Sequence, residues 1–251
     1  MSTEGGIAVV VGATGSFGRA IVSRLLGRGL AVVAVARSAD SLAALTRESQ
    51  RVTGCIADIA SDSATAAIAD AVRGPVRMVV HGPGVAVAGG VLTAPPAALV
   101  DAVNIKVGGM LRLVRAVEPR LGRGSRLVAI GGHYGFEPTA YAAAAGVANA
   151  ALANLMRQLS LAYGERGITA HLVAPGPADT ERLRRVAADR AKQRELPVED
   201  VLAEMKAESS LKAMTTPEQV AWAVALLLDP EADALTGSTL MLDSGRRRGL
   251  P

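Results

Sequence analysis

Short apolar runs alternate with amphipathic segments along most of this chain. Within each run neighbouring residues are apolar, so both faces are suited to burial, as in strands at the centre of a parallel sheet. The sequence therefore predicts seven strands, at residues 7–11, 30–36, 52–57, 76–80, 126–130, 168–174 and 238–242.

The segments between these runs carry apolar residues at the spacing of a helix that is buried on one side. Ile21 and Leu25 mark the first helix, and Leu42 and Leu45 mark the second. Longer helices are predicted over residues 97–121, 143–164 and 217–228.

Strands that alternate with helices imply right-handed crossovers between parallel strands. We expect a three-layer α/β/α fold, in which a doubly wound seven-stranded parallel sheet has the strand order 3-2-1-4-5-6-7. No internal repeat and no Pro- or Ser-rich linker divides the chain, so we expect one domain over residues 1–251. The charged segment 179–212 is too long for an ordinary connection, and we expect it to form a helical lid over a substrate site.

The composition limits the classes of protein that need to be considered. Half of the 251 residues are hydrophobic but only 2% are aromatic, so the core has to be built from aliphatic side chains. No apolar run reaches the roughly 18 residues that span a membrane, and residues 1–11 lack the apolar core of a signal peptide. Together with the single cysteine, Cys55, these features favour a cytoplasmic protein.

The formal net charge of +4 is modest, and the basic residues are dispersed except for the run Arg246-Arg247-Arg248. We interpret this run as a solvated tail rather than as a contact for nucleic acid, because short charge runs usually face solvent. We therefore expect a small-molecule substrate as the partner, and neither nucleic acid nor a membrane.

The segment Val11-Gly12-Ala13-Thr14-Gly15-Ser16-Phe17-Gly18 joins the first predicted strand to the first helix. Glycines let the backbone turn sharply and approach a pyrophosphate, to which the helix N-terminus offers its N–H groups. A tight turn between a strand and a helix also needs glycine for structural reasons alone. The position of this turn in a βαβ unit near the start of the chain favours nucleotide binding.

This turn resembles that of the short-chain dehydrogenase/reductase family, Thr-Gly-x-x-x-Gly-x-Gly, with Ser16 in place of the middle glycine. The resemblance continues through Asn149-Ala150-Ala151-Leu152 and Pro175-Gly176 to Asp243-Ser244-Gly245, and so covers essentially the whole chain. It implies a Rossmann-like fold and an oxidoreductase that uses a nicotinamide dinucleotide. The hydroxyl of Ser16 could either crowd the pyrophosphate or hydrogen-bond to it.

The end of the second predicted strand bears on the choice of dinucleotide. An acid at this position accepts a hydrogen bond from the ribose 2′-OH of NAD, but this chain has Ala36, followed by Arg37 and Ser38. Without the acid a 2′-phosphate is not repelled, and a guanidinium can pair with it. We therefore expect NADP(H) as the cofactor, although an exposed arginine at a strand end is also common.

The resemblance implies further cofactor contacts. Asp58, followed by Ile59, matches the family's acid near the adenine ring, although an ordinary turn residue would look the same. After the fourth strand the family's Asn-Asn-Ala-Gly is represented by His81-Gly82-Pro83-Gly84, in which only the last glycine matches. No metal ligands are expected. The full set of expected cofactor residues is Gly12, Thr14, Ser16, Phe17, Gly18, Arg37, Ser38, Asp58, Ile59, Gly82, Gly84, Asn149, Pro175, Gly176 and Thr180.

Three positions that hold the family's catalytic residues are occupied differently here. Asn149 lies where the family has its Lys, and the usual spacing then puts Ala145 at the Tyr position and Gly132 at the Ser position. In the family the Tyr protonates the carbonyl oxygen, the Lys lowers the pKa of the Tyr, and the Ser orients the carbonyl. Because a positioned general acid contributes roughly 10²–10⁴-fold in rate, ordinary ketone reduction should be crippled. A competing alignment makes Tyr141 the catalytic tyrosine but puts Ala145 at the Lys position.

Other residues are candidates to replace the lost proton donor. Tyr141 lies one turn before Ala145 if the helix extends that far, and His133 directly follows Gly132. Asn104 matches the family's asparagine that holds a water near the catalytic Lys. We take Asn104, Tyr141 and His133 as the catalytic candidates. Of the other polar residues, we expect His171 to be structural, consider His81 a weaker candidate, and set aside Lys106 and Glu137.

Three functions are compatible with these observations. The first is an NADP(H)-dependent oxidoreductase that acts on a small organic substrate by a non-standard mechanism. The second is a non-redox enzyme, such as a cyclase, dehydratase or isomerase, and the third is a catalytically silent binding or regulatory protein. The resemblance also implies a homodimer or homotetramer, since family members pair through the helices after the fourth and fifth strands.

Overall fold

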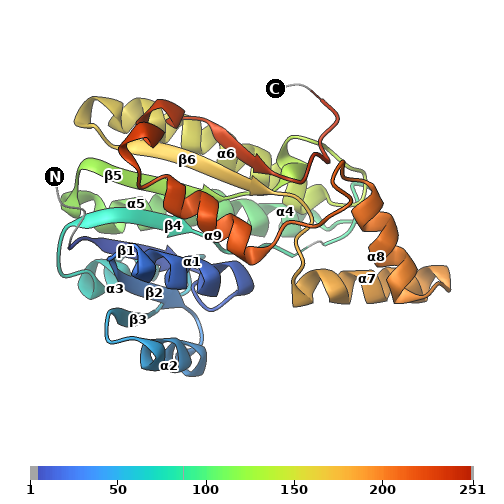
Figure 1. The fold of residues 1–251 in the computed structure, drawn as a ribbon, viewed down its shortest axis with the longest axis horizontal. Helices are drawn as coiled ribbons and strands as arrows, with labels where there is room; N and C mark the ends of the chain where they lie inside the picture. The colour runs from blue at the N-terminus through green and yellow to red at the C-terminus, as the bar shows by residue number, and fades with distance from the viewer. Residues whose placement is uncertain (1–4, 87, 250–251) are drawn as a thin grey trace.

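The computed structural model describes residues 5–86 and 88–249, except for the side chains of Arg182 and Gln193. Its seven strands form one parallel sheet in the order β3-β2-β1-β4-β5-β6-β7, which confirms the predicted order (Figure 1). The strands are β1 (Ile7–Val11), β2 (Ala31–Ala36), β3 (Val52–Ile56), β4 (Val76–His81), β5 (Leu121–Ile130), β6 (Thr169–Pro175) and β7 (Thr239–Leu242).

Helices join successive strands and cover both faces of the sheet, which makes three layers (Figure 1). The α-helices are α1 (Ser16–Gly27), α2 (Ala39–Glu48), α3 (Ser63–Ala71), α4 (Pro96–Val103), α5 (Gly109–Val117), α6 (Ala143–Tyr163), α7 (Glu181–Arg194), α8 (Val198–Ala207) and α9 (Pro217–Leu226). Shorter turns of helix are the π-helical η1 (Asn104–Gly108) and the 3₁₀-helical η2 (Glu118–Arg120), η3 (His133–Gly135), η4 (Gly164–Arg166) and η5 (Pro230–Leu235).

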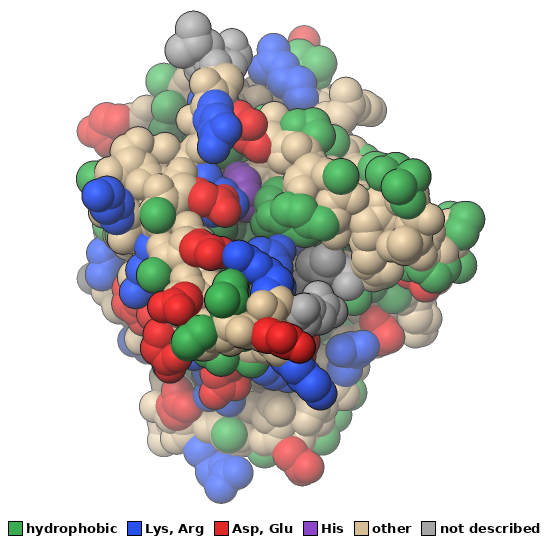
Figure 2. Space-filling view, turned by 90° about the vertical axis from the view of Figure 1, so that its right-hand side faces the viewer, with side chains coloured by type: hydrophobic (Ala, Val, Ile, Leu, Met, Phe, Trp, Pro, Cys, Tyr) green, Lys and Arg blue, Asp and Glu red, His purple; other side chains and the backbone are tan. Residues whose placement is uncertain are grey.

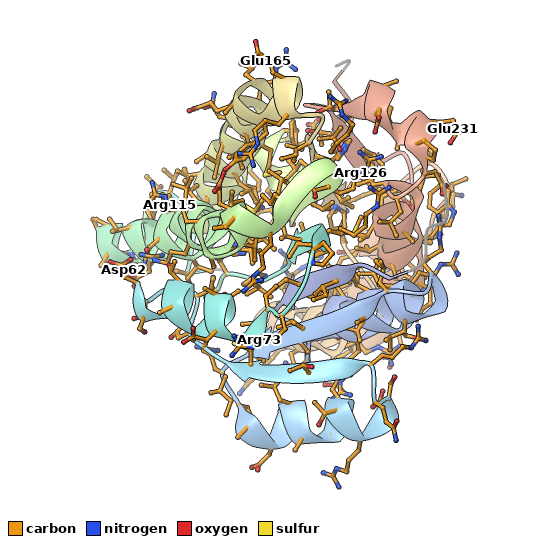
Figure 3. All side chains as sticks on the ribbon, turned by 90° about the vertical axis from the view of Figure 1, so that its left-hand side faces the viewer. Asp62, Arg73, Arg115, Arg126, Glu165 and Glu231 are labelled. Carbon is orange, nitrogen blue, oxygen red and sulfur yellow. The ribbon has the colours of Figure 1, made fainter. Side chains whose placement is uncertain are left out.

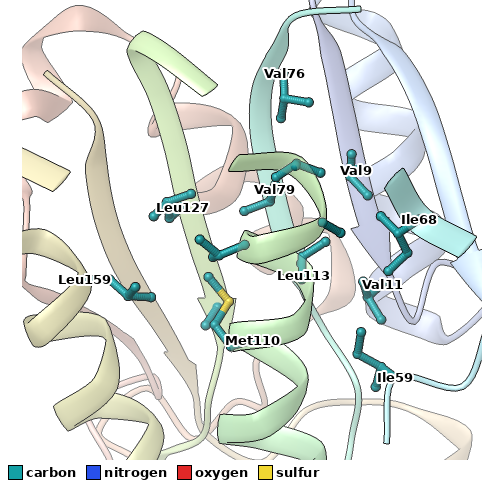
Figure 4. Packing of buried hydrophobic residues seen from close by; sticks show 14 of the residues in the cluster. Val9, Val11, Ile59, Ile68, Val76, Val79, Met110, Leu113, Leu127 and Leu159 are labelled. Carbon is teal, nitrogen blue, oxygen red and sulfur yellow. The ribbon is translucent and has the colours of Figure 1, made fainter. Parts of the chain in front are cut away.

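Successive side chains of each strand point to opposite faces of the sheet, so the chain builds two aliphatic cores. Val9 and Val11 of β1 lie in the core beneath α3, α5 and α6, whereas Ala8 and Val10 lie in the core beneath α1, α2 and α9. Figure 4 shows part of the first core, in which aliphatic side chains from α5 pack against those of the central strands. Burial on both faces explains why the central strand β1 is apolar at every position.

The region 97–121, which the periodicity predicts as one helix, is divided in the structure into α4, the π-turn η1, α5 and η2. A tertiary contact explains the π-turn. His81 on β4 donates from Nε2 to the carbonyl of Ile105 at 3.0 Å. A Cβ on Gly109 would lie only 2.8 Å from His81 Cε1, so glycine lets the helix pass this close to the strand. π-Turns inside helices frequently accompany functional sites.

The buried Arg126 connects β5 to the helix layer at the other end of the sheet (Figure 3). Its guanidinium donates to the carbonyl of Leu227 at 2.7 Å and to Thr169 Oγ1 at 3.1 Å, and it pairs with Asp233 at 2.6 Å. These partners satisfy a charge that would otherwise be costly to bury. Among the helices that the structure describes, none is long and apolar enough to cross a bilayer.

The lowered pKa values of two buried histidines predict that the free energy of unfolding depends on pH. Burial, with the charge of Lys106, lowers the pKa of His81 to about 3, and burial, with the charge of Arg126, lowers that of His171 to about 4. The unfolded chain therefore binds protons below pH 6.5 that the folded chain does not bind. The contribution of these histidines to the free energy of unfolding is fully present above pH 6.5 and is lost as the pH falls from there toward 4.

Between pH 7.5 and pH 5.5 we expect the free energy of unfolding to fall by about 1 kcal/mol for each of these histidines. Urea denaturation at a fixed protein concentration measures this fall. The variant His171→Gln should lose less stability over the same interval. Equal free energies of unfolding at the two pH values would contradict the prediction.

Candidate active site

A cavity of about 570 Å³ lies at the carboxyl ends of the central strands, where open α/β sheets bind their ligands. The turn after β1, the segments that follow β4, β5 and β6, the start of α6 and one face of α7 line it. Figure 2 shows this side of the molecule, on which many Lys, Arg, Asp and Glu side chains are exposed.

The turn between β1 and α1 is built for close approach of the backbone. Gly12 has a φ of 80°, a conformation that favours glycine. A Cβ on Gly18 would overlap the carbonyl oxygen of Gly12 and lie 2.7 Å from Ala13 Cα. The helix begins at Ser16 with neither a side-chain cap nor an acid in its first turn. Its N–H groups and its dipole therefore face the cavity without a competing carboxylate, as an anion-binding site requires.

Most of the cofactor residues that the sequence predicts meet at this cavity. Those that line it are Gly12, Thr14, Ser16, Phe17, Gly18, Gly82, Gly84, Asn149, Pro175, Gly176 and Thr180. Thr180 also caps α7, because its Oγ1 accepts from the N–H of Leu183 at 3.3 Å.

The remaining four predicted cofactor residues follow the neighbouring strands β2 and β3, outside the cavity lining. Arg37 is exposed. Ser38 caps α2 by accepting from the N–H of Ser41 at 3.3 Å. Asp58 accepts from the N–H of Ala60 at 3.0 Å, the bonding expected of an ordinary turn residue, and Ile59 is buried. These four residues lie at the same edge of the sheet as the cavity, because β2 lies beside β1 and β3 lies beside β2.

Gly132, Ala145 and Asn149 all line the cavity. A Cβ on Gly132 would lie 2.9 Å from Asn149 Nδ2, so the two residues are in contact. Asn149 is only 5% exposed, and its Oδ1 has no hydrogen-bond partner among the groups that the structure describes. A buried polar atom without a partner is uncommon, and a hydroxyl of a bound ligand would satisfy it.

Tyr141 lines the same cavity but does not belong to the helix. Because α6 begins at Ala143, Tyr141 lies in the preceding turn, and the prediction that it shares a helical face with Ala145 does not apply. Its hydroxyl lies 2.5 Å from that of Tyr134, another cavity residue, and the side chain is 40% exposed. A partly exposed tyrosine therefore lines the same cavity as Ala145 and Asn149.

His133 also lines the cavity and is 4% exposed. Burial is the main cause that lowers its pKa to about 4, and the charge of Arg246 adds to the effect. His133 is therefore neutral near pH 7, when it can exchange hydrogen bonds but is rarely protonated.

Asn104, the third catalytic candidate, lies behind the cavity wall. Its Nδ2 donates to the carbonyl of Ala60 at 3.0 Å, and its Oδ1 accepts from Arg112 at 2.9 Å. Arg112 in turn pairs with Asp62, which Figure 3 labels at the edge of the molecule. In the structure Asn104 thus holds the π-turn against the loop after β3.

Several cavity residues were not selected from the sequence. Lys106 is buried in the cavity wall, where its Nζ donates to the carbonyl of Ile130 at 2.7 Å. Tyr134 and Arg190 line the cavity from η3 and α7. The weak signal for Lys106 is its position two residues after Asn104, whereas no local motif marks Arg190. By contrast, His81, His171 and Glu137 do not line the cavity.

The interpretation of Arg246-Arg247-Arg248 as a solvated tail is wrong for its first residue. The Arg246 side chain is 13% exposed, forms an ion pair with Glu208, and donates to the carbonyl of Met205. The chain after β7 therefore packs back onto α8 instead of extending into solvent. Among the described residues, no group of three or more His, Cys, Asp or Glu could hold a metal ion.

Two glycines of α1 offer a matched pair of substitutions. Gly18→Ala forces a methyl group against the turn at Gly12, and overpacking of this kind typically costs about 1–3 kcal/mol. Gly27→Ala meets nothing within 4 Å and restricts only the unfolded chain, which should stabilise the protein by about 0.4–1 kcal/mol. Urea denaturation of both variants measures the difference, and an equal effect of the two substitutions would contradict the geometry of the turn.

Comparisons with known proteins agree with this arrangement. A family model described as enoyl-(acyl carrier protein) reductase matches residues 12–247. The chain is 30% identical over 256 residues to the short-chain reductase protein NovJ of Streptomyces niveus, with 96% of this chain and 93% of that protein covered.

Two solved structures have the same fold. L-sorbose reductase from Gluconobacter frateurii, in complex with NADPH and L-sorbose, superposes with a TM-score of 0.92 at 22% identity and covers 99% of both chains. A short-chain oxidoreductase from Pseudomonas aeruginosa PAO1, described as containing an atypical catalytic center, has a TM-score of 0.87 at 23% identity over 98% of both chains. With a family model that matches nearly its whole length, the chain belongs to the short-chain dehydrogenase/reductase family of oxidoreductases.

Proposed function

We propose that this protein is an NADP(H)-dependent oxidoreductase of a small organic substrate, in which Tyr141 is the proton donor. One observation carries the proposal: the glycine turn, Asn149 and Tyr141 all line a single cavity. The cavity therefore contains an anion-binding turn, the buried amide of Asn149 and the phenol of Tyr141. This combination suits a dinucleotide with a substrate beside it.

The residues present fit such a cofactor. The N-terminus of α1 would take the pyrophosphate, Asn149 Oδ1 would accept from a ribose hydroxyl, and Pro175, Gly176 and Thr180 would receive the nicotinamide end. Arg37 and Ser38 follow β2, beside the glycine turn, where a 2′-phosphate would lie. When bound, the cofactor would supply a hydride to the substrate.

The catalytic residues depart from the family pattern. Gly132, Ala145 and Asn149 take the places of the family's Ser, Tyr and Lys, and none of them can protonate a carbonyl oxygen. Tyr141 can do so, because it carries a phenol and lines the cavity as a 40% exposed residue. His133 is less suited as an acid because its pKa of about 4 leaves it neutral near pH 7.

The segment 179–212 forms α7 and α8 and contributes Glu181, Leu183, Val186 and Met205, among others, to the cavity wall. It acts as the substrate lid of one domain that spans the chain. Exposed Val100 on α4 and Val147 on α6, on the helices through which the family pairs, support a homodimer or homotetramer.

Isothermal titration calorimetry with NADPH, NADP⁺, NADH and NAD⁺ tests the cofactor assignment. We expect NADPH to bind more tightly than NADH. The double variant Arg37→Asp/Ser38→Ala should weaken NADPH about 10–100-fold, since a charge-assisted contact to the 2′-phosphate is lost, and should change NADH far less. Tighter binding of NADH by the wild type would overturn the assignment. Failure of all four to bind would favour the non-redox or binding alternatives.

The second prediction concerns proton transfer. Tyr141→Phe should reduce the rate of NADPH oxidation with an accepted carbonyl substrate by about 10²–10⁴-fold, while NADPH binding measured by calorimetry stays within a few fold of wild type. Absorbance at 340 nm with a panel of ketones and aldehydes measures the rate. Tyr163→Phe, on the far end of α6, is the matched control and should leave the rate unchanged. Brisk turnover that Tyr141→Phe does not alter would remove Tyr141 from the mechanism.

A further inference from the structure

Three side chains from three separate elements surround the hydroxyl of Tyr141. We propose that Arg190 on α7 and Tyr134 on η3 are positioning residues for Tyr141: the guanidinium and a hydrogen bond donated by the Tyr134 hydroxyl both stabilise its oxyanion. The catalytic use of the Tyr141 proton rests on the proposed function. The interaction of Tyr141 with Tyr134 and Arg190, which we call the electrostatic unit, does not.

The two tyrosines are arranged for a hydrogen bond between their hydroxyl groups. The oxygen atoms lie 2.5 Å apart, and the rings meet edge to face at 85° with centroids 5.6 Å apart. His133 packs against the other ring, with its centroid 4.0 Å from that of Tyr134. Tyr134 is thereby held between His133 and Tyr141, so its hydroxyl is directed at its partner.

The positive charge comes from the opposite side of the cavity. The guanidinium carbon of Arg190 lies 4.7 Å from the centroid of the Tyr141 ring, within the range of a cation–π contact. A cation this close to a phenol favours its ionised form. Arg246, which is held by Glu208, adds a second positive charge near the same oxygen.

The titration behaviour of the pair agrees with the geometry. Burial raises the pKa of Tyr141, but the hydrogen bond from Tyr134 and the charges of Arg190 and Arg246 outweigh it and leave the pKa below its ordinary value of 10.0. Burial and the contact with Tyr141 raise the pKa of Tyr134. These opposite directions agree with a hydrogen bond that Tyr134 donates to the oxygen of Tyr141, and they make Tyr141 the stronger acid of the two.

The proton balance is simple. As the substrate carbonyl carbon accepts a hydride and its C=O π-bond breaks, the carbonyl oxygen takes the proton of Tyr141. The Tyr141 oxyanion, which the hydrogen bond from Tyr134 and the charge of Arg190 stabilise, then recovers a proton from water. The carbonyl compound is reduced to an alcohol and one solvent proton is consumed. Arg190 exchanges no proton, and its charge stabilises the oxyanion between these two transfers.

This arrangement gives α7 a second role. In the family pattern the tyrosine and its lysine share one helix, four residues apart, whereas here the acid and the cation lie on different elements. The acidity of Tyr141 therefore depends on the position of α7, and the site is complete only when α7 lies against the turn before α6.

Spectrophotometric titration of the free protein tests the proposal without substrate or cofactor. The chain has only three tyrosines, and the third, Tyr163, has a raised pKa because it is partly buried. In the wild type we expect one tyrosine to ionise below pH 10, followed at 295 nm, and Tyr141→Phe should abolish that step. Arg190→Gln should move it upward by about 1 pH unit or more, and Arg190→Lys should restore most of the shift.

Arg184→Gln is the matched control, because Arg184 lies on the same helix but pairs with Asp179 and does not line the cavity. The Arg184→Gln variant should still show the ionisation of one tyrosine below pH 10. Tyr134→Phe should move the step upward because the donated hydrogen bond is lost.

The inference would be overturned if no tyrosine ionises below pH 10, or if Arg190→Gln leaves this ionisation unchanged in a folded protein. That result would leave the proposed function standing if NADPH still binds. Conversely, if one tyrosine ionises below pH 10 but no dinucleotide binds, the inference about Tyr141 would stand and the proposed redox function would be wrong.

Discussion

The parallel pairing of β1, β4, β5 and β6 determines where this protein can do chemistry. Because these strands run in one direction, the segments that follow them emerge at the same edge of the sheet. The glycine turn, Gly82, Gly132 and Gly176 become neighbours at this edge although they are far apart in the sequence. Because glycine has no side chain, the backbone itself borders the cavity at these positions.

The same edge explains how the family chemistry can be rearranged without loss of the fold. Gly132, Ala145 and Asn149 line the cavity, and each is smaller than the Ser, Tyr or Lys that the proposed function places at its position in the family. The turn before α6 then brings in Tyr141, and α7 brings in Arg190. In the proposed function the proton donor and its cation thus come from connecting segments, which tolerate change better than the strands that they join.

The sequence predicts the sheet well because its signal is local. Short runs made up mainly of apolar residues locate all seven strands, and the glycine turn locates the cavity. What the sequence does not predict depends on tertiary contacts. His81 contacts Ile105 and accompanies the π-turn in a region whose periodicity predicts one helix, and Glu208 draws Arg246 out of solvent. The role of Arg190 likewise arises from the fold, since nothing near it in the sequence connects it to Tyr141.

A crystal structure of the NADPH complex tests the central claim most directly, because it locates the cofactor and Tyr141 in one measurement. We expect the 2′-phosphate at Arg37, the pyrophosphate over the N-terminus of α1, and the nicotinamide in the cavity with the hydroxyl of Tyr141 facing its reactive carbon across the space for a substrate. A nicotinamide bound elsewhere, or separated from Tyr141 by protein atoms, would contradict the proposed role of Tyr141.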